Sequence, residues 1–224
     1  MAKKKLIRFE ELNGFSHVIQ PGEEYPLNDH TLKGNWSEKH FLNQHNIVLE
    51  VGCGKGEYTI ALAKSNISTN YIGVDIKGDR IWRGASEALA GNLHNVAFLR
   101  IQAQRLPYFF APNEVSEIWL TFPDPQLQKP KERKRLTSPY FLEIYRKVLC
   151  SDGLIHLKTD NLQLFDFTLD VVKSKGHVLH YCTYDLHGQA DPATSFLRQH
   201  RTYYENMYLN LGVSIKYLRF SLKQ

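Results

Sequence analysis

Apolar residues along the chain fall into two kinds of segment. Short apolar runs bounded by turn residues indicate buried strands, and longer segments with apolar residues at helical spacing indicate helices. Strands are expected over residues 46–51, 71–76, 96–101, 118–122, 154–158, 177–184 and 213–221. Helices are expected over residues 57–64, 79–90, 139–149, 162–173 and 202–209. This alternation predicts an α/β fold with a mostly parallel sheet and helices on both faces.

The first 44 residues do not follow this pattern. They begin with a basic stretch, and four of them interrupt any long helix, namely Pro21, Gly22, Pro26 and Gly34. We expect residues 1–44 to form a basic, irregular extension that packs on the domain or trails from it. Residues 45–224 are long enough to bury one core and show no internal boundary, so they should form a single domain.

Glycines and acids follow the first two expected strands. Residues 50–56 read E-V-G-C-G-K-G, and Asp75 lies at the end of the second strand. Glycines let a loop approach a ligand closely. An acid at the end of the second strand can accept hydrogen bonds from both hydroxyls of a ribose. Right-handed crossovers bring the carboxyl ends of parallel strands to one edge, so the two features should meet there. We therefore expect Glu50, Gly52, Gly54 and Asp75 to bind a nucleoside-containing cofactor.

The spacing of the glycines in this loop distinguishes between two possible cofactors. A dinucleotide needs G-x-G-x-x-G with the pyrophosphate at the helix N-terminus. This chain has G-x-G-x-G, and Glu50 stands two residues before the first glycine. A carboxylate repels a pyrophosphate but suits the ammonium and sulfonium of S-adenosylmethionine. That cofactor is favoured over NAD, and also over a tight turn that binds nothing.

Asp124 lies in the turn T-F-P-D-P directly after the fourth expected strand. This position puts its carboxylate at the same sheet edge as the cofactor loop. A carboxylate there can accept hydrogen bonds from the ring N–H and the exocyclic amino group of a guanine. It can equally cap the backbone of its own turn. The residues alone leave both interpretations open.

A basic run, K-P-K-E-R-K-R over residues 129–135, follows the Asp124 turn. Charge runs are usually solvated faces. Its place beside the expected site and the formal net charge of +5 nevertheless favour contact with nucleic-acid phosphates. The residues expected to make these contacts are Lys131, Arg133, Lys134 and Arg135.

Two later motifs have both a structural and a functional interpretation. Asp160, in K-T-D-N after the fifth strand, could hold substrate or cap the next helix. Thr202 and Glu205 have the spacing of a capping box, and from spacing alone this structural role is favoured. The three cysteines and ten histidines show no metal-binding spacing. No signal peptide or membrane span is recognised, so we expect a cytoplasmic protein without a metal.

The motifs together resemble those of tRNA (guanine-N7-)-methyltransferases. The resemblance rests on E-V-G-C-G-K-G, G-V-D at residues 73–75, F-P-D-P at residues 122–125 with its basic tail, K-T-D-N, and T-x-x-E at residues 202–205. F-P-D-P followed by the basic run is the most specific part. The resemblance implies the Rossmann-like class I methyltransferase fold, a seven-stranded sheet whose last strand is antiparallel. It also implies methyl transfer from S-adenosylmethionine to N7 of a guanosine in the variable loop of tRNA.

The resemblance also implies roles for single residues. Asp124 matches an acid at the junction of cofactor and guanine, and it is the expected catalytic residue and one of the expected cofactor-binding residues. The expected substrate-binding positions are Lys129, Asp160, Thr202, Tyr203, Tyr204 and Glu205. Gln102 stands where the family often has an acid near the adenine, and its carbonyl oxygen can still accept from the adenine amino group. Lys129 lies one place later than the usual substrate lysine.

Other functions with the same fold stay open at this point. The acceptor could be another RNA, or a protein or small molecule. The chain could also be an RNA-binding module that has lost catalysis, although the intact acids Glu50, Asp75 and Asp124 argue against this. An NAD-dependent dehydrogenase is the least favoured because of the glycine spacing.

Overall fold

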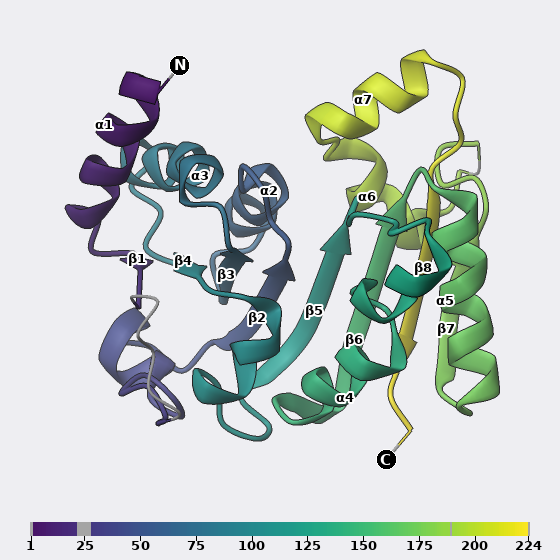
Figure 1. Ribbon diagram of the computed structural model, residues 1–224, viewed down its shortest axis with the longest axis horizontal. Helices are drawn as coiled ribbons and strands as arrows, with labels where there is room; N and C mark the ends of the chain where they lie inside the picture. Colours follow the sequence, from purple (N-terminus) through teal and green to yellow (C-terminus); the bar gives the residue numbers. More distant parts are fainter. Residues whose placement is uncertain (1, 22–27, 189, 224) are drawn as a thin grey trace.

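An eight-stranded sheet runs through the computed structural model, which describes residues 2–21, 28–188 and 190–223 (Figure 1). The strand order is β1-β4-β3-β2-β5-β6-β8-β7. The strands are β1 (Val18–Ile19), β2 (Asn46–Val51), β3 (Thr69–Asp75), β4 (Val96–Arg100), β5 (Val115–Thr121), β6 (Leu149–Thr159), β7 (Val178–Thr183) and β8 (Lys216–Ser221). Pairing is parallel from β1 to β6, and β8 runs antiparallel to both β6 and β7. The seven expected strands are confirmed, and the short β1 is an additional one.

Helices connect the strands and cover the sheet. The α-helices are α1 (Ala2–Asn13), α2 (Glu57–Ser65), α3 (Gly78–Ala90), α4 (Pro139–Arg146), α5 (Leu162–Ser174), α6 (Ser195–Gln199) and α7 (Tyr203–Asn210). The short helices are the π-helix η1 (Trp36–Phe41) and the 3₁₀ helices η2 (Ala103–Tyr108), η3 (Lys129–Lys134) and η4 (Pro192–Thr194). The five predicted helices correspond to α2, α3, α4, α5 and α7. None of the described helices has the length and apolarity needed to cross a bilayer.

Two hydrophobic cores lie on opposite faces of the sheet, because successive side chains of a strand point to opposite sides. In β2, Val48 packs in one core with Tyr58 of α2. The next residue, Leu49, packs in the other core with Phe141 of α4. This layering explains why the central strands read as continuous apolar runs. It also confirms the expectation of helices on both faces.

The described part of residues 1–44 is ordered structure, which corrects the expectation of an irregular extension. α1 packs beside α3, where Trp82 Nε1 donates to Glu11 Oε2 at 2.5 Å. β1 pairs with β4. Trp36 is fully buried; its Nε1 donates to the carbonyl of Phe109 at 2.8 Å, and its ring stacks on Phe110. These contacts join residues far apart in the chain, so the local pattern could not reveal them. The predicted helix breakers Gly22 and Pro26 lie outside the described residues.

The parallel strands bring the predicted motifs to one edge of the sheet. The loop after β2 is tied to β3, because the amides of Gly52 and Cys53 both donate to the carbonyl of Val74, at 2.8 and 3.1 Å. The turn after β5 is tied to β6, because the amide of Phe122 donates to the carbonyl of Lys158 at 2.8 Å. Figure 1 shows α6 and α7 beside the arrowhead of β5, at this same edge.

Candidate active site

The loop after β2 needs glycine at three positions. Gly52, Gly54 and Gly56 have φ of 80°, 56° and 72°, a region that other residues rarely adopt. Gly56 also has no room for a side chain, since a Cβ there would lie 2.6 Å from the ring of Phe98. The loop can therefore turn tightly at the start of α2 and expose its backbone at the edge of the sheet.

Glu50 is buried beneath this loop and is held by two threonines. Its Oε2 accepts from the Thr59 amide at 2.8 Å and from the Thr59 hydroxyl, and its Oε1 accepts from the Thr121 hydroxyl. Burial raises the pKa of Glu50 from 4.5 to about 7, and the nearby carboxylate of Asp75 adds to the rise. The hydrogen bonds oppose this change but do not cancel it. A buried carboxylate in this condition is suited to a cationic ligand.

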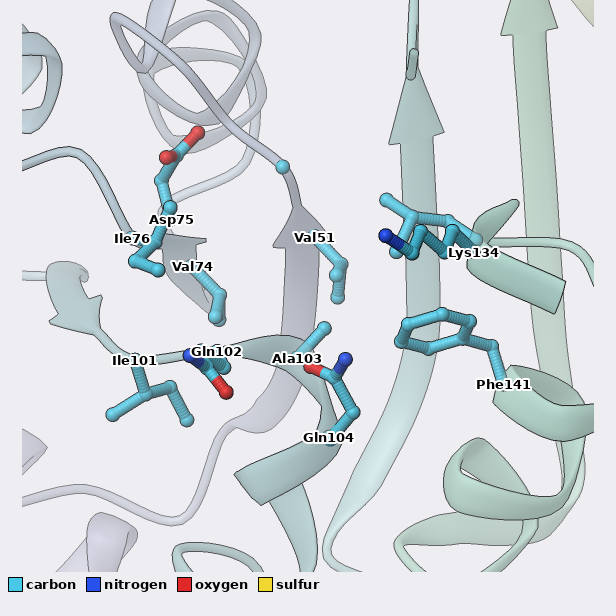
Figure 2. A pocket seen from close by; sticks show the side chains of 12 residues that line it. Val51, Val74, Asp75, Ile76, Ile101, Gln102, Ala103, Gln104, Lys134 and Phe141 are labelled. Atoms are coloured by element: carbon cyan, nitrogen blue, oxygen red, sulfur yellow. The ribbon is translucent and has the colours of Figure 1, made fainter. Parts of the chain in front are cut away.

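Asp75 lies at the end of β3 and is half-buried. Its Oδ2 accepts from the Gly54 amide and its Oδ1 from the Lys77 amide, both at 2.9 Å. It borders a cavity of about 420 Å³ whose other lining residues include Val51, Gly52, Ile76, Gln102, Gln104, Lys134 and Phe141. Figure 2 shows Phe141 and Lys134 on the side of this cavity opposite Asp75 and Ile76. The cavity thus has apolar walls and a few polar groups, as expected for a nucleoside site.

A second, smaller cavity of about 90 Å³ shares Gly52 with the first. It is bordered by Glu50, Tyr58, Thr121, Phe122 and Tyr204, among others. The hydroxyl of Tyr58 is buried and has no hydrogen-bond partner among the described residues. The pair of cavities therefore offers a large, mostly apolar space next to a small space with a buried acid and an unpaired hydroxyl. An elongated ligand with a nucleoside at one end and a cationic group at the other fits this arrangement.

Asp124 lies in an exposed turn next to the small cavity. Phe122 borders that cavity, but Asp124 does not line either cavity. Asp124 Oδ1 accepts from the Gln126 amide at 3.1 Å, so the predicted cap on its own turn is present. Phe122 and Gln126 have φ of 49° and 45°, and a residue other than glycine in this region costs on the order of 1–3 kcal/mol. The turn is therefore a strained structure that its surroundings must hold.

The basic run forms η3 and the residue after it. Lys129, Lys131, Arg133 and Lys134 are exposed, and Lys134 also borders the large cavity. Arg135 differs from them, because only 1% of its surface is exposed and its guanidinium donates to two backbone carbonyls. The prediction that Arg135 contacts RNA phosphate is therefore wrong. The sequence could not show this, because all five cations lie in one polar segment.

Asp160 is half-buried after β6, and burial raises its pKa. The cap of α5 is the next residue, Asn161, whose side chain accepts from the Leu164 amide at 2.8 Å. The alternative that Asp160 caps this helix is therefore wrong. Asp160 stays a candidate for substrate binding, at the same edge as Asp124.

The capping box at the start of α7 is confirmed. Thr202 Oγ1 accepts from the Glu205 amide at 3.2 Å, and Glu205 Oε2 accepts from the Thr202 amide at 3.4 Å. Glu205 is fully buried and also pairs with Lys158 Nζ at 2.8 Å and His187 Nε2 at 2.7 Å. The expectation that Glu205 binds substrate finds no support here, because its side chain is fully buried and lines neither cavity. Its role is to fix α7 to the sheet.

Tyr203 and Tyr204, the other residues of this motif, are exposed. The amide of Tyr203 donates to Glu57 Oε2 at 2.7 Å, which joins the start of α7 to the start of α2. The ring of Tyr203 lies 5.1 Å from Lys55 Nζ. The start of α7 therefore contributes to the wall of the small cavity, which Thr202 and Tyr204 border together with the glycine loop.

Several residues of the site were not singled out from the sequence. Thr59 and Thr121 bind Glu50, Tyr58 borders the small cavity, and Lys158 pairs with Glu205. Lys158 belongs to the K-T-D-N motif, and that motif was the one available signal for it. Within residues 2–21, 28–188 and 190–223, no group of His, Cys, Asp or Glu side chains is arranged to hold a metal ion.

The chain is similar to known proteins in sequence and in fold. The chain matches the family model described as "Putative methyltransferase" over residues 44–218. It is 48% identical over 223 residues to the tRNA (guanine-N(7)-)-methyltransferase of Christiangramia forsetii, covering 99% of both chains. It is 45% identical over 229 residues to the protein of the same name from Bacteroides fragilis, covering 100% of this chain and 88% of the relative. The crystal structure of the 16S rRNA methyltransferase KamB has the same fold, with a TM-score of 0.63 at 16% identity, covering 87% of this chain and 96% of that chain. The chain belongs to the family of tRNA (guanine-N(7)-)-methyltransferases.

Proposed function

We propose that the protein transfers a methyl group from S-adenosylmethionine to N7 of a guanosine in the variable loop of tRNA. The observation that carries this proposal is the buried carboxylate of Glu50, which borders a small cavity that shares Gly52 with a larger, nucleoside-sized one. An exposed carboxylate, Asp124, and an exposed basic helix, η3, lie beside these cavities. The names and high identity of the relatives support the same activity. An activity on tRNA is expected in the cytoplasm.

The residues around the two cavities fit S-adenosylmethionine. Glu50 would bind its ammonium group, since a buried carboxylate is stabilised by a cation. Asp75 would accept from the ribose hydroxyls, and Gln102 from the adenine amino group. Gly52 and Gly54 would let the loop backbone approach the ligand. When bound, this cofactor supplies a methyl group that its sulfonium has already activated.

The acceptor requires alignment more than acid–base chemistry. N7 of a neutral guanine carries a free lone pair, so no proton has to be removed before it attacks. Correct alignment of reacting groups can supply on the order of 7–11 kcal/mol. We assign this alignment to Asp124, whose carboxylate would accept from the pairing edge of the guanine and favour the positive charge that develops on the purine. Asp160, Tyr203 and Tyr204 lie at the same edge and would contact the nucleotide.

The exposed cations of η3 would bind the backbone of the RNA. Lys129, Lys131, Arg133 and Lys134 are exposed on η3, which follows the Asp124 turn. A guanosine within folded tRNA has to leave its stack to reach a small cavity, which costs a few kcal/mol. Phosphate contacts on η3 would offset that cost.

The activity is tested with tritiated S-adenosylmethionine, unmodified bulk tRNA and mapping of the labelled nucleoside. We expect label in N7-methylguanosine, and RNase treatment of the substrate should abolish incorporation. Label in a protein, a small molecule or another nucleoside would refute the proposed acceptor. No binding of the cofactor, measured by calorimetry, would refute the methyl donor.

The role of Asp124 is tested separately by Asp124→Ala in single-turnover methylation with both substrates saturating. We expect a loss on the order of 100-fold, because misplacing a reacting group by about 1 Å has that effect. Asp152→Asn is the matched control, since Asp152 is exposed at the amino end of β6, away from the site. A rate for Asp124→Ala within about threefold of wild type would remove Asp124 from the chemical step.

A further inference from the structure

Arg135 is a buried arginine at the end of an exposed basic segment. Its side chain is 1% exposed, whereas the neighbouring Arg133 and Lys134 are exposed. Burying a charge without partners is strongly unfavourable, so the contacts of this group indicate its role. The contacts are different in kind from those of a residue that binds a phosphate at the surface.

The guanidinium of Arg135 binds the backbone of the Asp124 turn. Its Nε donates to the carbonyl of Pro125 at 3.1 Å, and its Nη2 donates to the carbonyl of Gln126 at 3.3 Å. The group lies 4.3 Å from the ring centre of Phe167 on α5, and Nη1 lies 3.6 Å from Glu132 Oε1. The turn is thereby attached to α5, an element of the core, through a single side chain.

The residue that Arg135 binds is in turn hydrogen-bonded to the carboxylate of Asp124. The amide of Gln126 donates to Asp124 Oδ1 at 3.1 Å. Gln126 and Phe122, on either side of Asp124, both have φ in the left-handed region. A turn with two such residues keeps its conformation only when its surroundings fix it. Arg135 binds the carbonyl of one of these residues and that of the proline before it.

We propose that Arg135 is a positioning residue that holds the Asp124 carboxylate beside the small cavity for methyl transfer. This inference rests on the proposed function, since it assigns Arg135 to the same reaction. Arg135 acts through the turn and contacts neither cofactor nor RNA. A lysine cannot replace it fully, because the planar fork of arginine reaches two carbonyls at once and an ammonium is a single point of charge.

The test compares Arg135→Met and Arg135→Lys with wild type at saturating tRNA and cofactor. For Arg135→Met we expect kcat to fall on the order of 10- to 100-fold, with the Kd for S-adenosylmethionine and the KM for tRNA changed by less than about threefold. Arg135→Lys should lose about 3- to 10-fold, because one of two hydrogen bonds is kept. Arg146→Met is the matched control; Arg146 lies on α4 away from the turn, and its kcat should be unchanged.

Two further measurements separate positioning from a general structural role. In an Asp124→Asn background, Arg135→Met should cause no further loss of rate, because the residue acts through Asp124. The dependence of tRNA binding on salt should be the same for Arg135→Met as for wild type. By contrast, Lys134→Gln should lower the log–log slope by roughly 0.7–0.9, the value for one lost phosphate contact.

Three results would overturn the inference: a kcat of Arg135→Met within about threefold of wild type, an equal loss of rate on top of Asp124→Asn, or a smaller salt slope. If Arg135→Met does not fold, the same three measurements on Arg135→Lys decide. Failure of the proposed function looks different, because wild type itself would then not label N7 of a tRNA guanosine.

Discussion

Replacing Glu50 by glutamine should stabilise the protein without its cofactor, and the gain should grow as the pH rises. Burial raises the pKa of Glu50 in the folded state to about 7, from 4.5. A glutamine has the same shape and stays neutral. It can keep the hydrogen bonds, because its amide oxygen can accept from the amide and the hydroxyl of Thr59, and the hydroxyl of Thr121 can turn to accept from its NH2 group.

The sign and size follow from linkage. A carboxyl whose folded pKa is raised contributes stability below its unfolded pKa, and this contribution is lost as the pH rises through the folded pKa. At 1.36 kcal/mol per pH unit, the interval from 4.5 to about 7 corresponds to roughly 3 kcal/mol. Between about pH 5 and about pH 8, wild type should therefore lose roughly 2–3 kcal/mol relative to Glu50→Gln.

Urea unfolding of both proteins, followed by circular dichroism without cofactor, measures this difference at each pH. Other titrating groups are common to the two proteins and cancel. In the same pH range, the affinity of wild type for S-adenosylmethionine should rise up to about tenfold per pH unit, because the ammonium requires the ionised carboxylate. Glu50→Gln should bind weakly at every pH. A difference in unfolding free energy that does not change with pH would refute the reasoning.

Three further predictions concern other parts of the molecule. Glu205→Gln should lower the free energy of unfolding, measured in urea, by about 3–5 kcal/mol, because it leaves the buried ammonium of Lys158 without its carboxylate. Adding Lys158→Met to this variant should recover most of the loss. Replacing Lys129, Lys131, Arg133 and Lys134 by glutamine should lower the log–log salt slope of tRNA binding by roughly 2.8–3.6, and an unchanged slope would make η3 a solvated surface. Gly56→Ala should lower the stability of the fold by about 2–4 kcal/mol, since its Cβ would meet the ring of Phe98. Gly54→Ala has open space for the Cβ and should lower it by only about 1–2 kcal/mol. Equal losses of stability in thermal unfolding would contradict the packing argument.

The sequence predicted the alternating elements well where each one follows a local rule. The strands of the sheet carry apolar runs, and α7 begins at a capping box that the spacing of Thr202 and Glu205 indicates by itself. The sequence analysis failed over the described part of residues 1–44, where Trp36 is buried through contacts with distant residues such as Phe109 and Phe110. Local periodicity carries no information about partners more than seventy positions away.

The sequence likewise indicated some features of the candidate site and not others. Closely spaced glycines, an acid two residues before them and an acid at the end of the next strand form a local pattern, so the chain by itself could indicate that Glu50, Gly52, Gly54 and Asp75 meet at one edge of the sheet, where they border the two cavities. The raised pKa of Glu50 could not be named, because it depends on burial and on Asp75 from another strand.

The chain by itself determined the order of strands and helices, and hence the edge where the motifs meet, because backbone geometry and strand crossovers obey short-range rules. Tertiary structure alone decided what each charged side chain does there. Arg135 and Lys134 are adjacent cations in the sequence, yet one is buried against the Asp124 turn and the other is exposed. Burial and partners depend on the packing of distant elements, and a one-dimensional pattern does not contain them.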